Sequence, residues 1–402
     1  MVAWEQRKLG DGLSKVGDGI HGTPEYREDG LVPFINGNNL VDGNVLVTDE
    51  TKYVDELQKT KNDNLLNSNT ILMSINGTIG NLARYNGENI MLGKSTAYLI
   101  VEEYSKEYVY YLLQTNQIYK HFMSSLTGTT IKNLGLKIIK ETPCLIPRIE
   151  EQTKIGNFFK QLDETITLQE RELELLKLTK KSFLQQLFPE TNQLFPNIRF
   201  ANFQDEWQQR KFEDMLDIEN GVRRGPFGSA LKKEFFIKNS DYVVYEQQNA
   251  IYDNYETRYN ISKEKFDELK VFKLLEKDFI MSGAGTIGRI SRVPKGIKQG
   301  VFNQALIRFR INGKITDAEY FIQFIRAEKM QRKLTGANPG SAITNLVPMS
   351  EVKKWDILVP KVEEQIEIGF FLNRLDEAIT LQKRKLDKLK KMKKSFLQKM
   401  FI

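Results

Sequence analysis

A stretch of about 43 residues occurs twice in this chain without a gap, and roughly 25 of its positions are identical. The first copy occupies residues 146–188 and the second occupies residues 359–401. Each copy follows a larger region of mixed sequence, so the chain is a tandem duplication. At 402 residues it is long enough for two domains with separate cores. The repeat therefore predicts two copies of one fold.

Apolar residues recur within each copy at alternating steps of four and three, which is the spacing of a coiled-coil seam. The two sets are Ile155, Phe159, Leu162, Ile166, Leu173, Leu176, Phe183 and Leu187, then Ile368, Leu372, Leu375, Ile379, Leu386, Leu389, Phe396 and Met400. Two seam positions are polar in both copies, Gln169 with Gln382 and Lys180 with Lys393. Polar seam residues can set helix register at a cost in stability. For the lysines, the alternative is a solvated or partner-facing edge near the helix ends.

The repeats are expected to form two long helices that pack against each other. Pro147 and Pro360 precede them, glutamates occupy their first turns and lysines lie near their ends, an order that suits the helix dipole. A helix of residues 150–187 would span about 57 Å, more than one turn of B-DNA at roughly 34 to 36 Å. The simplest closed arrangement is an antiparallel, pseudo-twofold pair, an intramolecular coiled coil that would hold two domains at a fixed separation.

Shared motifs extend the duplication into the regions before the helices. Trp4-Glu-Gln-Arg-Lys matches Trp207-Gln-Gln-Arg-Lys, and Ser74-Ile-Asn-Gly-Thr-Ile-Gly matches Ser282-Gly-Ala-Gly-Thr-Ile-Gly. Apolar runs bounded by Gly and Asn predict strands at 70–75, 97–101, 279–282 and 305–311, and apolar faces predict helical segments near 106–125 and 317–334. Each half is therefore predicted to be an α+β (mixed α/β) domain. Elsewhere the halves diverge, so one scaffold carries two different surfaces.

These elements predict five segments along the chain. They are a first domain at 1–145, a helix at 146–188, a linker at 189–206, a second domain at 207–358 and a second helix at 359–402. Pro189 and Pro196 in the linker would end the first helix. The halves differ in one respect, since residues 195–203, which lead into Trp207, have no counterpart before Trp4.

The composition narrows the function classes. The 59 basic and 52 acidic residues leave a net charge of +7 and a pI near 9.0, which permits nucleic-acid binding without establishing it. Cys144 is the single cysteine, and His21 and His121 are the only histidines. An internal disulfide is therefore impossible, and the composition argues against a zinc site or a histidine-dependent triad. A charged amino-terminal segment and the lack of an apolar run of about 18 residues predict a soluble, cytoplasmic protein.

No catalytic constellation is visible in the sequence. Residues 283–288 have the form GxGxxG, but the following Arg289-Ile-Ser-Arg-Val is typical of a strand, so a tight turn between strands is predicted. The sequence lacks a GxxxxGK[ST] loop, and it lacks the Asn-Pro-Pro-Tyr type of tetrapeptide with which amino-methyltransferases hold a flipped base. The chain is predicted to bind and not to catalyse.

Polar loops remain as candidate contact regions, because amide, hydroxyl and basic side chains bond base edges and phosphates. They contain His21, Thr23, Asn36, Asn38, Asn39, Thr129, Thr130, Lys132 and Asn133 in the first half, and Arg223, Arg224, Lys232, Lys233, Gln247, Gln248, Asn249, Asn338, Ser341, Thr344 and Asn345 in the second. For each residue alone, a turn or cap role is at least as plausible as a base contact. Recurrence at equivalent places favours the loops over individual side chains.

The whole pattern resembles the specificity subunit of Type I restriction-modification systems. The resemblance rests on two divergent domains, each followed by a nearly identical helix with Pro-x-x-Glu-Glu-Gln, Leu-Asp-Glu and Lys-Lys-Ser-Phe-Leu-Gln, and on Trp4-Glu-Gln-Arg-Lys-Leu and Gly77-Thr-Ile-Gly. It covers essentially the whole chain. It implies two target recognition domains, each reading one half of a bipartite, asymmetric site in double-stranded DNA, with the helices as a spacer.

The resemblance also implies partners and cofactors. Two methylation subunits would dock on the chain and methylate adenine, and two restriction subunits would translocate and cleave DNA. S-adenosylmethionine, ATP and magnesium would belong to those partners, with no cofactor, metal or membrane contact in this chain. Two other interpretations stay open: a free-standing sequence-specific DNA-binding regulator, and a coiled-coil scaffold that would show no salt-dependent DNA affinity.

Overall fold

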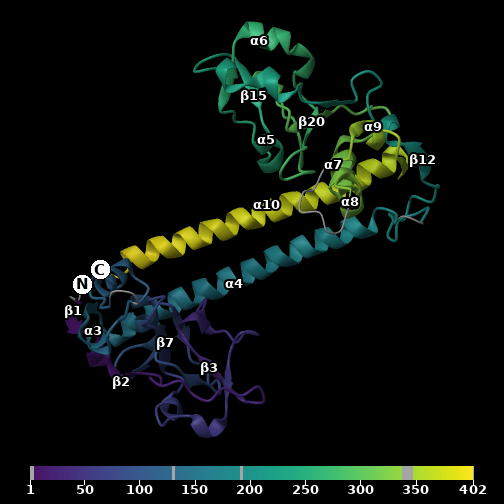
Figure 1. Cartoon of the computed structure of the whole chain (residues 1–402). Coiled ribbons are helices and arrows are strands. Elements are labelled where there is room, and N and C mark those ends of the chain that lie inside the picture. Colours follow the sequence, from purple (N-terminus) through teal and green to yellow (C-terminus); the bar gives the residue numbers. More distant parts are fainter. Residues whose placement is uncertain (1–3, 129–131, 191–192, 337–346, 402) are drawn as a thin grey trace. The chain divides into compact units, whose positions relative to one another are not determined.

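The computed structural model describes residues 4–128, 132–190, 193–336 and 347–401 (Figure 1). The chain divides into two compact units. Unit 1 comprises Met1–Arg171 together with Arg384–Ile402, and unit 2 comprises Glu172–Lys383. Each unit is described by itself below.

Two long helices account for the repeated segments. Helix α4 covers Ile149–Gln186 and helix α10 covers Val362–Lys399, each with 38 residues (Figure 1). The division between the units falls inside both helices, so each unit contains the beginning of one helix and the end of the other. The prediction of two long helices of equal length is confirmed. The five segments predicted above are bounded by the ends of helices and linkers, whereas the two units are defined by contacts. The predicted domain boundaries therefore stay predictions.

Unit 1 is built on an antiparallel sheet whose strands lie in the order β2-β10-β7-β8. A smaller sheet, β6-β3-β9, has a parallel β3–β9 pair, and two antiparallel pairs, β1–β11 and β4–β5, complete the strands. The strands are β1 Glu5–Lys8, β2 Leu13–Asp18, β3 Val32–Ile35, β4 Leu40–Val41, β5 Asn44–Val45, β6 Tyr53–Val54, β7 Thr70–Ser74, β8 Leu82–Arg84, β9 Met91–Leu92, β10 Thr96–Val101 and β11 Pro143–Ile146. The short helices are α1 Lys106–Leu112, α2 Asn116–Ser124 and α3 Leu136–Glu141.

Unit 2 repeats this plan with the strand order β13-β20-β17-β18 and a second sheet, β14-β16-β15-β19, in which β15 and β19 are parallel. Strands β12 and β21 pair as β1 and β11 do. The strands are β12 Gln208–Lys211, β13 Val222–Arg224, β14 Phe236–Ile237, β15 Tyr242–Tyr245, β16 Tyr259–Ile261, β17 Phe279–Ser282, β18 Ile290–Arg292, β19 Gln299–Phe302, β20 Leu306–Phe309 and β21 Asp356–Val359. The short helices are α5 Gln247–Tyr252, α6 Lys263–Glu268, α7 Ala318–Arg326, α8 Glu328–Leu334 and α9 Met349–Val352.

The main sheet of each unit is buried on both faces, which explains the uninterrupted apolar runs in its central strands. In unit 2, Phe279 and Met281 of β17 share a core with helix α7, while Ile280 points to the other side, toward β15 and β19. Ile71 and Leu72 of β7 divide in the same way between the two cores of unit 1. The predicted α+β class and the predicted strands are therefore confirmed.

Each helical segment predicted near 106–125 and 317–334 consists of two helices, and this corrects the prediction. Thr115 separates α1 from α2, because its side chain accepts a hydrogen bond from the amide of Ile118 and starts a new helix. Ala327 separates α7 from α8, because its ψ of 137° is extended and not helical. Apolar spacing alone does not reveal such interruptions.

A buried glutamine joins the start of each long helix to its own domain. Gln152 accepts a hydrogen bond from the backbone N–H of Ser105, at the start of α1, at 2.9 Å, and donates to the carbonyl of Pro147 at 2.9 Å. Gln365 bonds the backbone N–H of Asp317, before α7, and the carbonyl of Pro360 at the same two distances of 2.9 Å. The repeated Glu-Glu-Gln motif thus satisfies backbone groups that burial would otherwise leave unpaired.

A glycine one turn further on brings each long helix against the same short helix. A Cβ atom on Gly156 would lie 2.7 Å from the amide nitrogen of Tyr108, and one on Gly369 would lie 2.5 Å from that of Tyr320. Both distances are too short for a side chain, so only glycine permits this approach.

The end of each long helix packs into the core of the other half's domain. Phe401 lies with its ring centroid 5.2 Å from that of Tyr108 and 5.8 Å from that of Phe159, in unit 1. Phe188 lies 5.6 Å from Tyr320 and 5.9 Å from Phe324 in unit 2, measured in the same way. Each unit is therefore closed by an aromatic residue that follows the helix of the other repeat.

Ion pairs between α4 and α10 show that the helices run antiparallel within each unit. In unit 1, Lys393 lies 2.6 Å from Asp163 and Lys390 lies 2.6 Å from Glu170. As residue numbers rise along α4, those of the partners on α10 fall. All the predicted apolar seam residues are buried or half-buried. The predicted antiparallel pairing is confirmed.

The polar seam residues of unit 2 also face the opposite helix. Lys180 lies 2.6 Å from Asp376, and Gln382 donates to Glu172 at 2.8 Å. The side chain of Lys180 is only 11% exposed, so this lysine packs against the opposite helix and does not lie on a solvated edge. Burial lowers the pKa of Lys180, and the carboxylate of Asp376 opposes that shift. Gln169 is buried as well. A role of these residues in register stays a prediction.

Candidate nucleic-acid interface

In unit 1, several turns meet at one end of the main sheet around the connection between β9 and β10. Three backbone hydrogen bonds hold them together: Ile20 N–H to Leu92 O at 2.9 Å, Gly93 N–H to Ile35 O at 2.9 Å, and Ile75 N–H to Ser95 O at 2.9 Å. A fourth joins Gly77 N–H to Lys132 O at 3.3 Å. We call residues 19–23, 36–39, 75–80, 93–95 and 132–133 the turn cluster of unit 1.

The equivalent turns of unit 2 meet around the connection between β19 and β20. Gly225 donates to Leu306 O at 2.9 Å, Gly283 donates to Ala305 O at 2.7 Å, and Asn303 donates to Tyr245 O at 2.9 Å. We call residues 225–228, 246–249, 283–289 and 303–305 the turn cluster of unit 2. Because the four strands of one main sheet correspond one to one to those of the other, the two clusters occupy equivalent places on the two copies of the scaffold.

The repeated Gly-Thr-Ile-Gly motif forms a tight turn in both clusters. Gly77 and Gly80 have φ values of +71° and +88°, and Gly285 and Gly288 have +62° and +81°. These left-handed conformations favour glycine. The turns join β7 to β8 and β17 to β18, which are antiparallel neighbours. The prediction that the GxGxxG run is a turn between strands is confirmed.

The structure brings most of the candidates in the first half into the turn cluster of unit 1. His21, Thr23, Asn38 and Lys132 are exposed. The ring of His21 lies 2.9 Å from Asp18. Asn36 accepts a hydrogen bond from the hydroxyl of Ser95 at 2.9 Å, and Asn133 pairs with Thr127 through its backbone. Thr129 and Thr130 lie outside the described residues.

Two candidate asparagines serve the scaffold in the same way in both units. The side-chain oxygen of Asn39 accepts from the backbone N–H of Asn36 at 3.0 Å, and that of Asn249 accepts from the backbone N–H of Glu246 at 2.7 Å. Their NH₂ groups donate to the carbonyls of Leu46 and Asn254, respectively. Both side chains are buried, so their amides are used inside the domains.

In unit 2, the basic candidates flank the turn cluster. Arg224 ends β13 and is exposed, as are Lys232 and Lys233, while Arg223 is half-buried over the ring of Phe272 at 5.9 Å. Gln247 and Gln248 are half-buried at the start of α5. The candidates Asn338, Ser341, Thr344 and Asn345 lie outside the described residues.

A buried arginine that the sequence did not single out lies beside Arg223. Arg308 of β20 pairs in register with Arg223 of β13 and is only 1% exposed. It donates to the carbonyl of Asn220 at 3.0 Å. Burial lowers its pKa to about 10, and the neighbouring positive charge of Arg310 adds to that effect. Its only sequence signal is an arginine inside an otherwise apolar strand. The two arginines concentrate positive charge next to the turn cluster of unit 2.

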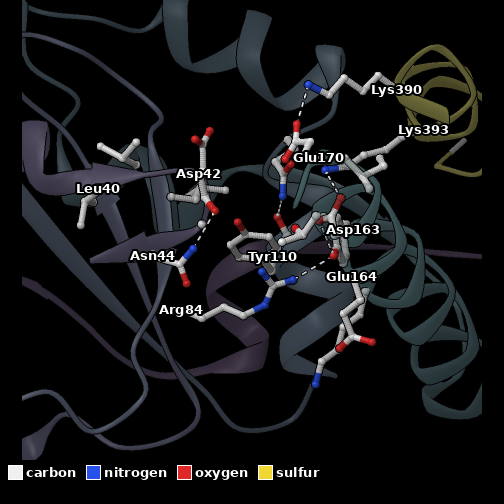
Figure 2. A pocket seen from close by; sticks show the side chains of 18 of the residues that line it. Leu40, Asp42, Asn44, Arg84, Tyr110, Asp163, Glu164, Glu170, Lys390 and Lys393 are labelled. Atoms are coloured by element: carbon white, nitrogen blue, oxygen red, sulfur yellow. Dashed lines mark hydrogen bonds and ion pairs between the residues drawn. The ribbon is translucent and has the colours of Figure 1, made fainter. Parts of the chain in front are cut away.

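A cleft of about 1070 Å³ lies in unit 1 between the β4–β5 hairpin and α4 (Figure 2). Figure 2 shows charged side chains from the domain and from both long helices gathered there. Arg84 pairs with Glu107 at 2.7 Å, and the hydroxyl of Tyr111 donates to Asp163 at 2.8 Å. Lys393 pairs with the same aspartate. This network, which sequence reasoning missed, holds the domain to both helices.

Unit 2 repeats the aspartate–lysine pair of this network at the equivalent repeat positions, and Gln323 takes the part of Tyr111. Asp376, the counterpart of Asp163, accepts hydrogen bonds from Gln323 at 3.0 Å and from Lys180 at 2.6 Å. The aspartate of the repeated Leu-Asp-Glu motif is thus an anchor between domain and helices in both units. Its oxygens are occupied by these partners, which suits a structural role.

Two further observations concern the described residues alone. They contain no group of three or more His, Cys, Asp or Glu residues that could hold a metal ion. No helix among them combines the length and the apolar character that crossing a membrane requires.

Comparisons with known proteins match both halves of the chain. The model of the Type I restriction modification DNA specificity domain matches residues 1–178 and again residues 204–391. The Type I restriction enzyme MjaVIII specificity subunit of Methanocaldococcus jannaschii is 21% identical over 411 residues, which cover 98% of this chain and 91% of that protein. The likeness therefore extends over both domains and both helices.

Solved structures share the fold. The S subunit of a Type I restriction-modification system from M. genitalium has a TM-score of 0.59 at 16% identity and covers 100% of this chain and 96% of its own. A chain from a structural study of complex assembly and conformational transition of the type I R-M system has a TM-score of 0.58 at 12% identity, with coverage of 98% and 96%. At identities of 16% and 12%, these likenesses show a shared fold and nothing further.

Proposed function

This chain belongs to the family of Type I restriction-modification specificity subunits, and we propose that each of its two turn clusters reads one half of a bipartite, asymmetric DNA site. The observation that carries the proposal is that equivalent turns of one scaffold gather at the same end of both main sheets while their sequences differ. A conserved frame with divergent turns is what two unlike half-sites require. The exposed polar and basic side chains there supply the hydrogen-bond donors and positive charge.

The two clusters would contact DNA through different chemistry. In unit 1, the exposed His21, Thr23, Asn38 and Lys132 offer mostly neutral groups. In unit 2, Arg224, Lys232 and Lys233 offer positive charge around the cluster. Arginine in particular can bond guanine with two parallel hydrogen bonds. Unit 2 would therefore contribute more of the salt-dependent affinity.

Two methylation subunits would dock on equivalent surfaces of the two long helices. Leu168 on α4 and Leu381 on α10 stand at the same position of the repeat, and they are 55% and 69% exposed. An apolar side chain exposed at the same place in both repeats suits two copies of one partner. Adenine methylation and DNA cleavage would be the work of these and of two restriction subunits, with S-adenosylmethionine, ATP and magnesium bound there. A complex that acts on cellular DNA would work in the cytoplasm.

Methylome sequencing of a host that carries this chain and its methylation subunit tests the proposal. We expect methylated adenines in one asymmetric motif with two short specified parts and an unspecified gap of constant length. A strain without this chain is the control and should lack the motif. A continuous motif, or no motif that depends on the chain, would contradict the proposal.

The change of Arg223 and Arg224 to Ala should affect one half-site only. We expect a loss of about 1 to 3 kcal/mol for each true base contact, with relaxed sequence choice in that half. Binding of the reconstituted complex to duplexes with single base changes in either half measures this. Lys295→Ala is the control, since this exposed lysine lies beyond the other end of β18. An equal loss across all sequences would identify phosphate contacts instead.

A further inference from the structure

Phe227 of unit 2 is 90% exposed, although phenylalanine is among the residues that proteins most often bury. It stands in the loop Gly225-Pro226-Phe227-Gly228, directly after β13 and directly before the short 3₁₀ helix Gly228–Leu231. No ring contact joins it to another described aromatic residue. The fold itself therefore gives this side chain no packing role.

The loop that carries Phe227 packs closely against the domain just before this residue. A Cβ atom on Gly225 would lie 1.9 Å from the carbonyl oxygen of Asn303, so glycine is required where the loop crosses the turn between β19 and β20. Pro226 is buried. A Cβ on Gly228 would lie 3.8 Å from the side chain of Gln304, an ordinary van der Waals distance, so the far side of the loop also lies near this turn. An exposed ring on a supported loop can be inserted into a partner with little loss of conformational entropy.

The charges around the loop identify the kind of partner. Arg223 and Arg224 precede it and Lys232 and Lys233 follow it. Arg308 adds a buried positive charge beside Arg223. Lys232 lies 3.8 Å from Glu234, which partly offsets one of these charges. An apolar ring within a basic frame suits a polyanion with a stacked apolar interior, which describes duplex DNA.

We propose that Phe227 acts as a wedge that enters the base stack of the half-site read by unit 2 and loosens one step there. Apolar side chains inserted in this way unstack neighbouring base pairs and kink the duplex. A loosened step lowers the cost of turning a base out of the helix, which a DNA adenine methyltransferase must do. The inference rests on the proposed function and adds a residue that determines how unit 2 engages DNA.

The equivalent loop of unit 1 has no such wedge. Its sequence is Gly22-Thr23-Pro24-Glu25-Tyr26, and Tyr26 packs against Phe34 with ring centroids 5.7 Å apart. The backbone of Glu25 is held by two hydrogen bonds with the side chain of Gln58. The two equivalent loops therefore differ, and this asymmetry between them can be measured.

The test uses the full chain assembled with its methylation subunits and duplexes that carry the motif found by methylome sequencing. We expect Phe227→Ala to lower the methylation rate on the fully paired duplex by about 10- to 100-fold. A mismatch at the target adenine of the half-site read by unit 2 should restore the rate to within a few fold, because the step is then already unstacked. The same mismatch in the other half should not. Phe227→Leu should keep most of the activity.

Ile218→Ala is the matched control, since Ile218 is equally exposed but lies before β13, at the opposite end of that strand from the loop. An unchanged rate for Phe227→Ala would overturn the wedge. So would a loss that no mismatch relieves, which would mean a structural role, or weaker assembly with the methylation subunits in the absence of DNA, which would mean a protein contact. If the wild-type complex methylates no bipartite motif, the proposed function fails first.

Discussion

Four residues inserted into both long helices, after Arg171 and after Lys383, are expected to lengthen the unspecified gap of the DNA site by about one or two base pairs. These are the points at which the units divide in each helix. Four residues add about 6 Å of helix, and a base pair occupies about 3.4 Å of B-DNA. They also rotate one end against the other by about 40°, and B-DNA turns by a comparable angle over one or two base pairs. Methylome sequencing reads the new gap directly.

The same insertion in one helix alone should abolish methylation of the motif. The pairs Lys393–Asp163 in unit 1 and Lys180–Asp376 in unit 2 hold the two helices together on either side of the insertion. Extra residues in one helix alone must then bulge or break a pair. An equal insertion in the linker after Leu194 is the control and should leave the gap unchanged. An unchanged gap after the double insertion would refute the idea that the helices set the spacing.

Phe401→Ala is expected to destabilise unit 1 by about 3 to 5 kcal/mol, the usual cost of removing a buried aromatic ring. Phe401 contacts Tyr108 and Phe159, so the cavity would open in the centre of the core of unit 1. Phe188→Ala should have the same effect on unit 2 through Tyr320 and Phe324. Chemical denaturation gives the total loss.

Hydrogen exchange assigns that loss to a unit. We expect faster exchange in β7 and β10 for Phe401→Ala, and in β17 and β20 for Phe188→Ala. Phe370→Ala on α10, the helix that Phe401 follows, is the control, because this exposed ring should contribute less than about 0.5 kcal/mol. Faster hydrogen exchange in unit 2 for Phe401→Ala would contradict the conclusion that the end of the second repeat completes the core of unit 1.

Sequence reasoning succeeded where the signal is periodic or repeated. The seam from Ile155 to Leu187 shows its period within one helix, and comparison with the second copy removes accidental matches. The Gly-Thr-Ile-Gly turns were predictable because left-handed conformations favour glycine. The strands around Leu72 and Ile280 were predictable because a sheet covered on both faces leaves an uninterrupted apolar run.

The remaining features depend on contacts that are distant in the sequence. Asn39 and Asn249 carry the same amide as the exposed Asn38, and only burial distinguishes their roles. Gln152 reads as one more polar residue on a helix until Ser105 is placed against it. Asp163 and Lys393 are far apart along the chain, and no local pattern joins them. Arg308 is visible in the sequence as an arginine within an apolar strand. That it lies beside Arg223 follows only from the pairing of β13 with β20.

The sharing of helix ends between the units also dictates an order of maturation. Unit 2 is a continuous stretch, whereas unit 1 needs residues 384–402 to close its core. A ribosome adds roughly 5 to 20 residues per second, so about 230 further residues separate Arg171 from completion by roughly 10 to 50 s. During that interval Tyr108 and Phe159 lack the ring of Phe401, so the nascent first half exposes apolar surface that the finished chain buries. The half that is made first is thus the half that is finished last.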